Sequence, residues 1–213
     1  MDWVKKIGWF LALLVMRVVG KACGRLIAET AMSPTGPTDE VIRRESQSGA
    51  GIMDEIRAEA RRRYPQLSEI EAMDKVAKER SEQKLATQTG FKKQVTAAST
   101  FEGMYFKFTN KYAEVCSRHG VGIGPFTSVV AARFSREHSQ ADSVLNSAGI
   151  DGAARRKLYQ GAEFASAFDT ITTNELTAVG EGNVRLGCET LRDYPEEMVG
   201  QITVSEEIVR AMY

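Results

Sequence analysis

The sequence predicts an all-α protein, on three observations. Apolar residues recur at steps of three and four along most of the chain, which is the period of an amphipathic helix. Glycine and proline interrupt that period at intervals, as they do between helices. No convincing run of alternating β-branched residues occurs, and only residues 199–204 suit a brief extended piece. We expect an N-terminal membrane-anchoring or amphipathic helix, a charged helical stalk and a C-terminal helical bundle.

The composition divides the chain into four segments. Residues 1–31 form the hydrophobic or amphipathic anchor helix, and residues 32–38 form a linker whose prolines and glycine stop any helix. Residues 39–95 are a charged helical segment. From residue 96 to residue 213 aromatic residues are more frequent and charged residues less frequent. This composition indicates one bundle with a core large enough to fold without disulfides or bound metal.

The first segment has the composition of a membrane anchor. An apolar run covers residues 7–16, and both tryptophans of the chain lie in or near it, where the membrane–water interface favours them. Cations at four-residue spacing follow, and their long side chains can reach lipid head groups. The residues assigned to the anchor are Trp3, Lys5, Lys6, Trp9, Phe10, Leu13, Leu14, Arg17, Lys21 and Arg25.

The mode of attachment stays open between two forms, which one continuous helix can combine. A span over residues 3–22 is near the length of about 20 apolar residues that a bilayer needs, whereas an amphipathic helix would lie in the interface. Charges after the apolar run disfavour a cleaved signal peptide, and Lys21 disfavours lipidation of Cys23. The remaining alternative is a buried helix of a soluble domain.

Three helices are expected in the charged segment. The first is a short helix that Thr38 or Asp39 caps and that runs through Ser46. The second covers residues 52–64 and ends at Pro65, and the third runs from Ser68 to about Gln88. Ser68 and Glu71 have the spacing of a capping box. The second and third helices each have a thin apolar stripe among many charges. That pattern suits a solvated stalk, a coiled segment or a helix lying on a partner, and equally a surface helix of the main domain.

The bundle begins with an aromatic helix that ends at His119 and Gly120, where glycine supplies the left-handed terminating residue. Its expected buried face is Phe101, Met104, Tyr105, Phe108, Tyr112, Val115 and Cys116. Further helices are expected after Pro125, after the capping residue Asp151, over residues 184–194 and from Ser205 onward. Breaks at residues 147–149 and 180–182 separate them, so the bundle has four or five helices.

No residue pattern identifies a catalytic, cofactor or metal site. The glycine-rich loop of residues 120–125 lacks the strand and the lysine of a phosphate-binding loop. His119 is expected to interact with a helix C-terminus. His138 has Asp142 one turn away, but no further ligand at suitable spacing, so we assign it to a solvated helix face. An enzyme in this chain would have to use scattered residues.

Cys116 and Cys188 each lie on the apolar face of an expected bundle helix. They can form a disulfide in an oxidising compartment, or remain buried thiols in a reducing one. Cations on the two sides of the apolar run nearly balance, so the positive-inside rule does not choose the side of the membrane. We favour the disulfide, and with it a bundle on the periplasmic side if the membrane is a bacterial inner membrane.

The formal net charge is zero, so the chain has no overall attraction to nucleic acid. Two functions remain. The first is a membrane-anchored, non-catalytic subunit that binds other proteins in a bacterial-type envelope complex, such as a secretion, transport or respiratory assembly. The second is a peripheral membrane protein, conceivably an enzyme, whose bundle binds a small molecule or lipid in a pocket lined by Phe101, Tyr105, Phe108, Phe134, Phe164 and Phe168.

Overall fold

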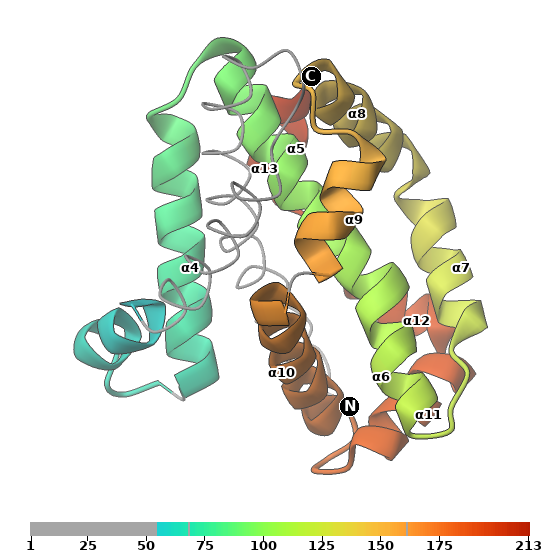
Figure 1. Cartoon of the computed structure of the whole chain (residues 1–213). Helices are drawn as coiled ribbons and strands as arrows, with labels where there is room; N and C mark the ends of the chain where they lie inside the picture. Colours follow the sequence, from blue (N-terminus) through green and yellow to red (C-terminus); the bar gives the residue numbers. More distant parts are fainter. Residues whose placement is uncertain (1–54, 68, 161) are drawn as a thin grey trace.

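A computed structural model of the chain describes residues 55–67, 69–160 and 162–213, and all regular elements in these ranges are helical (Figure 1). This confirms the all-α fold class. The expected anchor and linker, residues 1–38, lie outside the described residues and remain predictions, as does the Ser68 cap. Within the described ranges, no helix is both long and apolar enough to span a bilayer.

The second and third helices expected in the charged segment are present as a helix over residues 55–63 and as α4 (Glu69–Ala86). The short helix expected to end at Ser46 lies outside the described residues. Charged side chains join the two helices to each other. Arg63, for example, lies 2.6 Å from Glu79 in an ion pair that is more than one-third exposed on both sides, and such pairs contribute little individually. Apolar residues on both helices are buried: Ile56, Ala60, Met73, Val76 and Ala77.

A continuous helical rod forms the centre of the bundle. It consists of α5 (Gly90–Phe106), the π-helix η1 (Lys107–Lys111) and α6 (Tyr112–Arg118). Gly120 ends the rod with a φ of 74°, as expected. The expected aromatic face is confirmed, because Phe101, Met104, Phe108, Tyr112, Val115 and Cys116 are buried and Tyr105 packs against them. The π-helix was not predicted.

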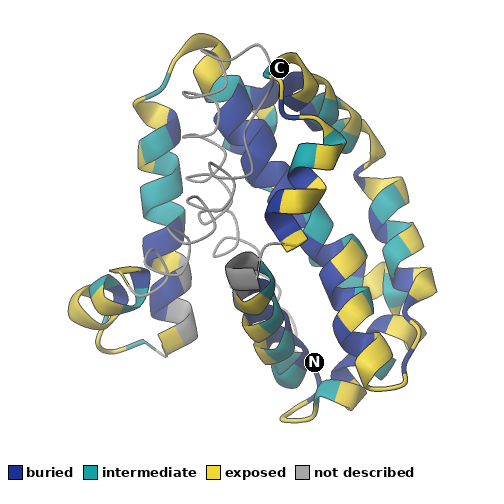
Figure 2. Ribbon diagram, viewed as in Figure 1, coloured by how far each residue is buried: buried dark blue, intermediate teal, exposed yellow. Residues whose placement is uncertain are grey.

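Shorter helices surround the rod. Helices α8 and α13 pack on α5, α7 and α10 pack on η1, and α10 pairs with α11. Figure 2 shows that the buried faces of these helices turn toward the rod. The bounds are α7 (Gly124–Arg133), α8 (Ser135–Ser147), α9 (Gly152–Gln160), α10 (Ala162–Val179), α11 (Val184–Asp193), α12 (Pro195–Gly200) and α13 (Glu206–Met212).

Several expected helix ends are confirmed. The Oδ1 atom of Asp151 accepts hydrogen bonds from the backbone N–H groups of Ala153 and Ala154, at 2.9 and 2.8 Å. Gly149 has a φ of 76° after α8. Before α13, the Ser205 hydroxyl accepts a hydrogen bond from the N–H of Glu207 at 3.3 Å. Local capping residues therefore predict these helix ends correctly.

The described part of the bundle has more helices than the four or five expected, because α9 and α10 both lie where one helix was expected after Asp151, and α12 was not expected. Two further expectations about element boundaries were wrong. The helix expected after Pro125 is divided into α7 and α8 at Phe134, whose φ of −104° and ψ of 16° are not helical. Phe134 stays buried across this bend because its ring packs on Phe101 at a centroid distance of 6.2 Å. Residues 199–204 are not one extended piece, since residues 199 and 200 close helix α12.

Helices α10 and α11 approach each other very closely at Gly187. A Cβ atom at this position would collide with the backbone carbonyl of Leu176 on α10. Gly187 is buried and lies directly before Cys188. The absence of a side chain at Gly187 therefore sets how close α11 lies to α10.

We predict that Gly187→Ala lowers the free energy of unfolding by about 1–3 kcal/mol, because backbone atoms must move to admit the methyl group. Gly200→Ala is the matched control, since a Cβ there meets nothing within 4 Å, and its stability should change by less than about 1 kcal/mol. Urea unfolding followed by circular dichroism measures both. Equal effects of the two substitutions would contradict the close approach.

Candidate functional site

The structure joins the two cysteines that the sequence placed on apolar faces. Cys116 on α6 and Cys188 on α11 form a disulfide, and both residues are fully buried. The bond closes a loop with a sequence separation of 72. In the chain-entropy account, a loop of this length stabilises the folded state by about 4 kcal/mol. The ten predicted anchor residues lie outside the described part of the chain.

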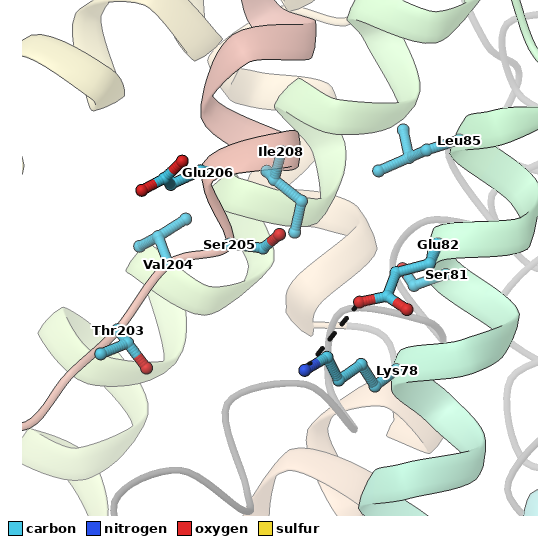
Figure 3. A pocket seen from close by; sticks show the side chains of 9 residues that line it. All are labelled: Lys78, Ser81, Glu82, Leu85, Thr203, Val204, Ser205, Glu206 and Ile208. Carbon is cyan, nitrogen blue, oxygen red and sulfur yellow. Dashed lines mark ion pairs between the residues drawn. The ribbon is translucent and has the colours of Figure 1, made fainter.

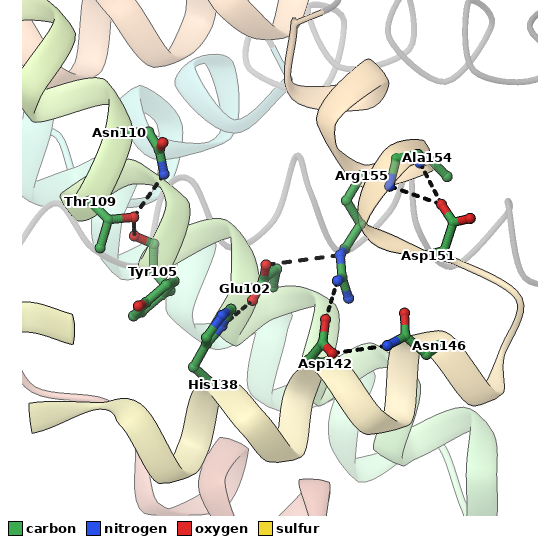
Figure 4. Close-up of polar contacts among 11 residues, drawn as sticks. Glu102, Tyr105, Thr109, Asn110, His138, Asp142, Asn146, Asp151, Ala154 and Arg155 are labelled. Carbon is green, nitrogen blue, oxygen red and sulfur yellow. Dashed lines mark hydrogen bonds and ion pairs between the residues drawn. The ribbon is translucent and has the colours of Figure 1, made fainter. Parts of the chain in front are cut away.

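A polar junction connects α5, α8 and α9 (Figure 4). Its centre is the buried carboxylate of Glu102 on α5. One oxygen of Glu102 lies 2.9 Å from Nδ1 of His138 on α8, and the other lies 3.9 Å from Nε of Arg155 on α9. Arg155 also donates a hydrogen bond to Asp142 on α8. Glu102 is thus shared by two cations from different helices.

His138 is held on two sides. Its ring stacks on the ring of Tyr105, with centroids 4.0 Å apart and an angle of 12° between the planes. The hydrogen bond to Glu102 raises the pKa of His138 above its ordinary value of 6.5, and the charges of Glu102 and Asp142 act in the same direction. Partial burial and Arg155 oppose the rise. The net effect favours the imidazolium form.

The junction can hold and release a proton through His138. In enzymes that use a serine or cysteine nucleophile, a histidine acts as the general base and a carboxylate fixes its orientation. No hydrogen bond in the described residues connects His138 to a hydroxyl or thiol nucleophile. The geometry therefore supports a titratable structural contact between helices.

A second polar cluster, the buried triad of Lys107, Tyr112 and Glu175, lies in the core. The ammonium of Lys107 on the π-helix lies 2.7 Å from one oxygen of Glu175 on α10, and both side chains are almost fully buried. The Tyr112 hydroxyl donates to the other oxygen at 2.5 Å. Burial, followed by the Glu175 charge, raises the pKa of Tyr112 well above its usual value and keeps it a donor. The triad ties α10 to the rod.

A groove of about 350 Å³ lies between α4 and the segment before α13 (Figure 3). Leu85 and Ile208 contribute apolar side chains from its two sides, and Lys78 and Glu82 form an ion pair of 4.0 Å at one edge. None of the six aromatic residues assigned to a pocket lines this groove. Among them, Phe101, Phe108, Phe134 and Phe168 are buried core residues, and the side chain of Phe164 lies outside the described residues.

Sequence reasoning missed both polar clusters. It assigned His138 to a solvated face, because Glu102 lies 36 positions away and their proximity leaves no periodic signal. One signal was available for each cluster. Glu102 and Lys107 are charged residues inside an otherwise aromatic and apolar helix, and a charge in such a place needs a buried partner. The identity of that partner requires the fold.

Within the described residues, no group of three or more His, Cys, Asp and Glu side chains is arranged to hold a metal ion. Comparisons with models of protein families, with curated proteins and with solved structures give no match to this chain. Functional inference therefore rests on the chain's own geometry.

We predict that His138 makes stability depend on pH. The folded-state pKa is above the unfolded value of 6.5, so the stabilisation is fully present below pH 6.5 and is lost as the pH rises through the folded pKa. His138→Gln should remove this step in urea-unfolding curves recorded between pH 5 and 9. His119→Gln replaces the other histidine and should keep the step, because the Glu102 contact is intact. A step that survives in His138→Gln would refute this assignment.

We predict that Lys107→Met destabilises the fold by about 3–5 kcal/mol, because it leaves the Glu175 carboxylate buried without its cation. Lys107→Met combined with Glu175→Leu should recover most of that loss, since no buried charge remains. Lys111→Met is the control: its partner Glu114 is half-exposed, so the expected loss is below about 1 kcal/mol. Thermal and urea unfolding of the three variants test the triad, and a double variant no more stable than Lys107→Met would contradict it.

Proposed function

We propose that the protein is a membrane-anchored, non-catalytic helical subunit that binds other proteins in an envelope complex, such as a secretion, transport or respiratory assembly. Residues 1–31 anchor it, and the bundle is the interaction module. In a bacterial inner membrane the bundle lies on the periplasmic side, where disulfides persist.

The Cys116–Cys188 disulfide is the observation that supports this proposal most directly. Both cysteines are fully buried and pair across α6 and α11. Structural disulfides are frequent in oxidising compartments and rare in the cytoplasm. This bond therefore supports a place outside the cytoplasm for the bundle, while the apolar, tryptophan-containing start of the chain suits a membrane anchor.

A non-catalytic role agrees with how the core is filled. Aromatic rings of the rod contact one another, as Phe108 and Tyr112 do at a centroid distance of 5.1 Å, and they occupy the place where a ligand pocket was considered. The His138–Glu102 pair has no nucleophile hydrogen-bonded to it in the described residues. Partners of this bundle would therefore bind at its surface, since aromatic side chains fill the core.

Binding of a small molecule or lipid remains the second candidate, and the groove between α4 and the segment before α13 favours it. Its volume of about 350 Å³ falls within the range of ligand sites. Leu85, Val204 and Ile208 would contact an apolar group there. A lipid or metabolite that raises the melting temperature would support this candidate.

The test uses the full chain in native membranes. Thiols are blocked in intact cells before lysis, and the protein is then purified in mild detergent and analysed by nonreducing peptide mapping and by mass spectrometry of copurified proteins. We expect Cys116 and Cys188 to be linked and a defined set of envelope proteins to copurify. Cys23→Ser is the control, because it should leave the linked pair unchanged.

Attachment is tested in the same preparation. Leu13→Glu with Leu14→Glu should move the protein to the soluble fraction, whereas Leu186→Glu, at an exposed position of α11, should not. Free thiols in the native compartment would reject the placement of the bundle. Membrane retention of the Leu13 and Leu14 variant would reject the anchor.

A further inference from the structure

Two of the four large apolar side chains that the described residues expose lie at the same end of the bundle. Phe91 at the start of α5 is 49% exposed, and Tyr213 after α13 is 54% exposed. The two residues lie near each other, because Nε2 of Gln94, three residues after Phe91, is 3.5 Å from the backbone oxygen of Tyr213. The other two, Leu186 and Tyr194, belong to α11 and its end, at the opposite end of the molecule in Figure 1.

Cations surround the two aromatic side chains. Lys93 and Arg210 line an open hollow of about 670 Å³ together with Phe91, and the adjacent Lys92 is exposed. The guanidinium of Arg136 on α8 lies 5.4 Å from the centre of the Tyr213 ring. Glu207 also lines the hollow, and Glu206 forms an ion pair of 3.4 Å with Arg210. The four cations outnumber these two acids. We call this surface the aromatic–basic face: Phe91, Lys92, Lys93, Arg136, Arg210 and Tyr213.

The lysines of this face occupy an unfavourable place in the isolated protein. The first turn of α5 contains Lys92 and Lys93 and no acidic residue, and Thr89 makes no capping hydrogen bond. Positive charge at a helix N-terminus opposes the helix dipole. A negatively charged surface brought against this end would remove that repulsion, whereas a neutral or basic surface would not.

We propose that the aromatic–basic face docks on an anionic phospholipid surface, an inference that rests on the proposed anchoring of residues 1–31. Exposed aromatic rings beside Lys and Arg are the composition that inserts at the boundary between head groups and acyl chains. Phe91 and Tyr213 enter this boundary, and Lys92, Lys93, Arg136 and Arg210 contact phosphate groups. The bundle then lies on the membrane that holds its own anchor.

The length of the chain allows this arrangement. The described chain begins at residue 55, and residues 32–54 connect it to the anchor segment. Extended to about 3.3 Å per residue, those 23 residues reach roughly 75 Å, whereas α4 with its 18 residues is roughly 27 Å long. The anchor and the aromatic–basic face can therefore meet the same bilayer from opposite ends of α4.

Hydrogen exchange of the full-length protein bound to vesicles tests the docking. The first N–H groups of α5, residues 90–92, have no acceptor within the helix and exchange rapidly unless something covers them. With vesicles that contain phosphatidylglycerol, we expect slower exchange at residues 90–92 and 210–213 than with phosphatidylcholine alone. Phe91→Ser with Lys92→Glu and Lys93→Glu should abolish this protection, because each lysine contributes about fivefold to binding of an anionic surface.

The matched control changes the opposite end of the bundle: Leu186→Ser with Arg185→Glu and Arg192→Glu on α11 should retain full protection. Co-sedimentation with both kinds of vesicle measures the anchor separately. Co-sedimentation without protection, or equal protection on phosphatidylcholine, would overturn the docking face and leave the anchor intact. No co-sedimentation with either vesicle would reject the anchor and the docking face together.

Discussion

An ammonium group in a hydrocarbon core must have a carboxylate beside it, because an unpaired buried charge costs several kcal/mol. Lys107 imposes this constraint on the bundle, and Glu175 meets it from α10. Helix α10 can therefore lie against the π-helix in one register only. Gly187 then places α11 directly on α10, which brings Cys188 to Cys116 on the rod. The ion pair, the close approach and the disulfide thus join the rod, α10 and α11 to one another by three different kinds of chemistry.

Different interactions hold the two halves of the rod to the helices around them. The η1–α6 half is held by a buried charge pair and a covalent bond. The α5 half is held to α8 and α9 through Glu102, which His138 and Arg155 share at the edge of the core. The His138–Glu102 contact is strongest when the imidazole is protonated. The pH dependence that we predict for stability therefore originates between α5 and α8.

The sequence predicted those features that local patterns encode. The helical fold class, the aromatic face of the rod, the ends at Gly120, Gly149 and Asp151 and the pairing of two buried cysteines all follow from periodicity, capping chemistry and burial. The bend at Phe134 was not predictable, because the residue keeps its place in the apolar period on both sides of the break.

Long-range pairing explains what the sequence did not predict. Lys107 and Glu175 are 68 positions apart, and His138 and Glu102 are 36 apart. Charged residues that do not pair with each other also occur at such separations along a chain of helices, so the separations alone do not indicate a contact. The π-helix belongs to the same class, since one extra residue in a turn is decided by where Lys107 must point and not by helix propensity. Charged residues in an apolar stretch signalled that buried partners exist, but only the fold identifies them.

The polar junction and the aromatic–basic face share two helices. Helix α5 carries Phe91 and Lys92 in its first turns and Glu102 further along, and α8 carries both Arg136 and His138. A surface that contacts the starts of α5 and α8 therefore acts on the same helix pair whose spacing the His138–Glu102 contact sets. Protons accumulate near anionic surfaces together with other cations, which favours the imidazolium form that Glu102 already stabilises. At the proposed docking face, an anionic surface and Glu102 would thus both favour the protonated form of His138 that holds α8 to α5.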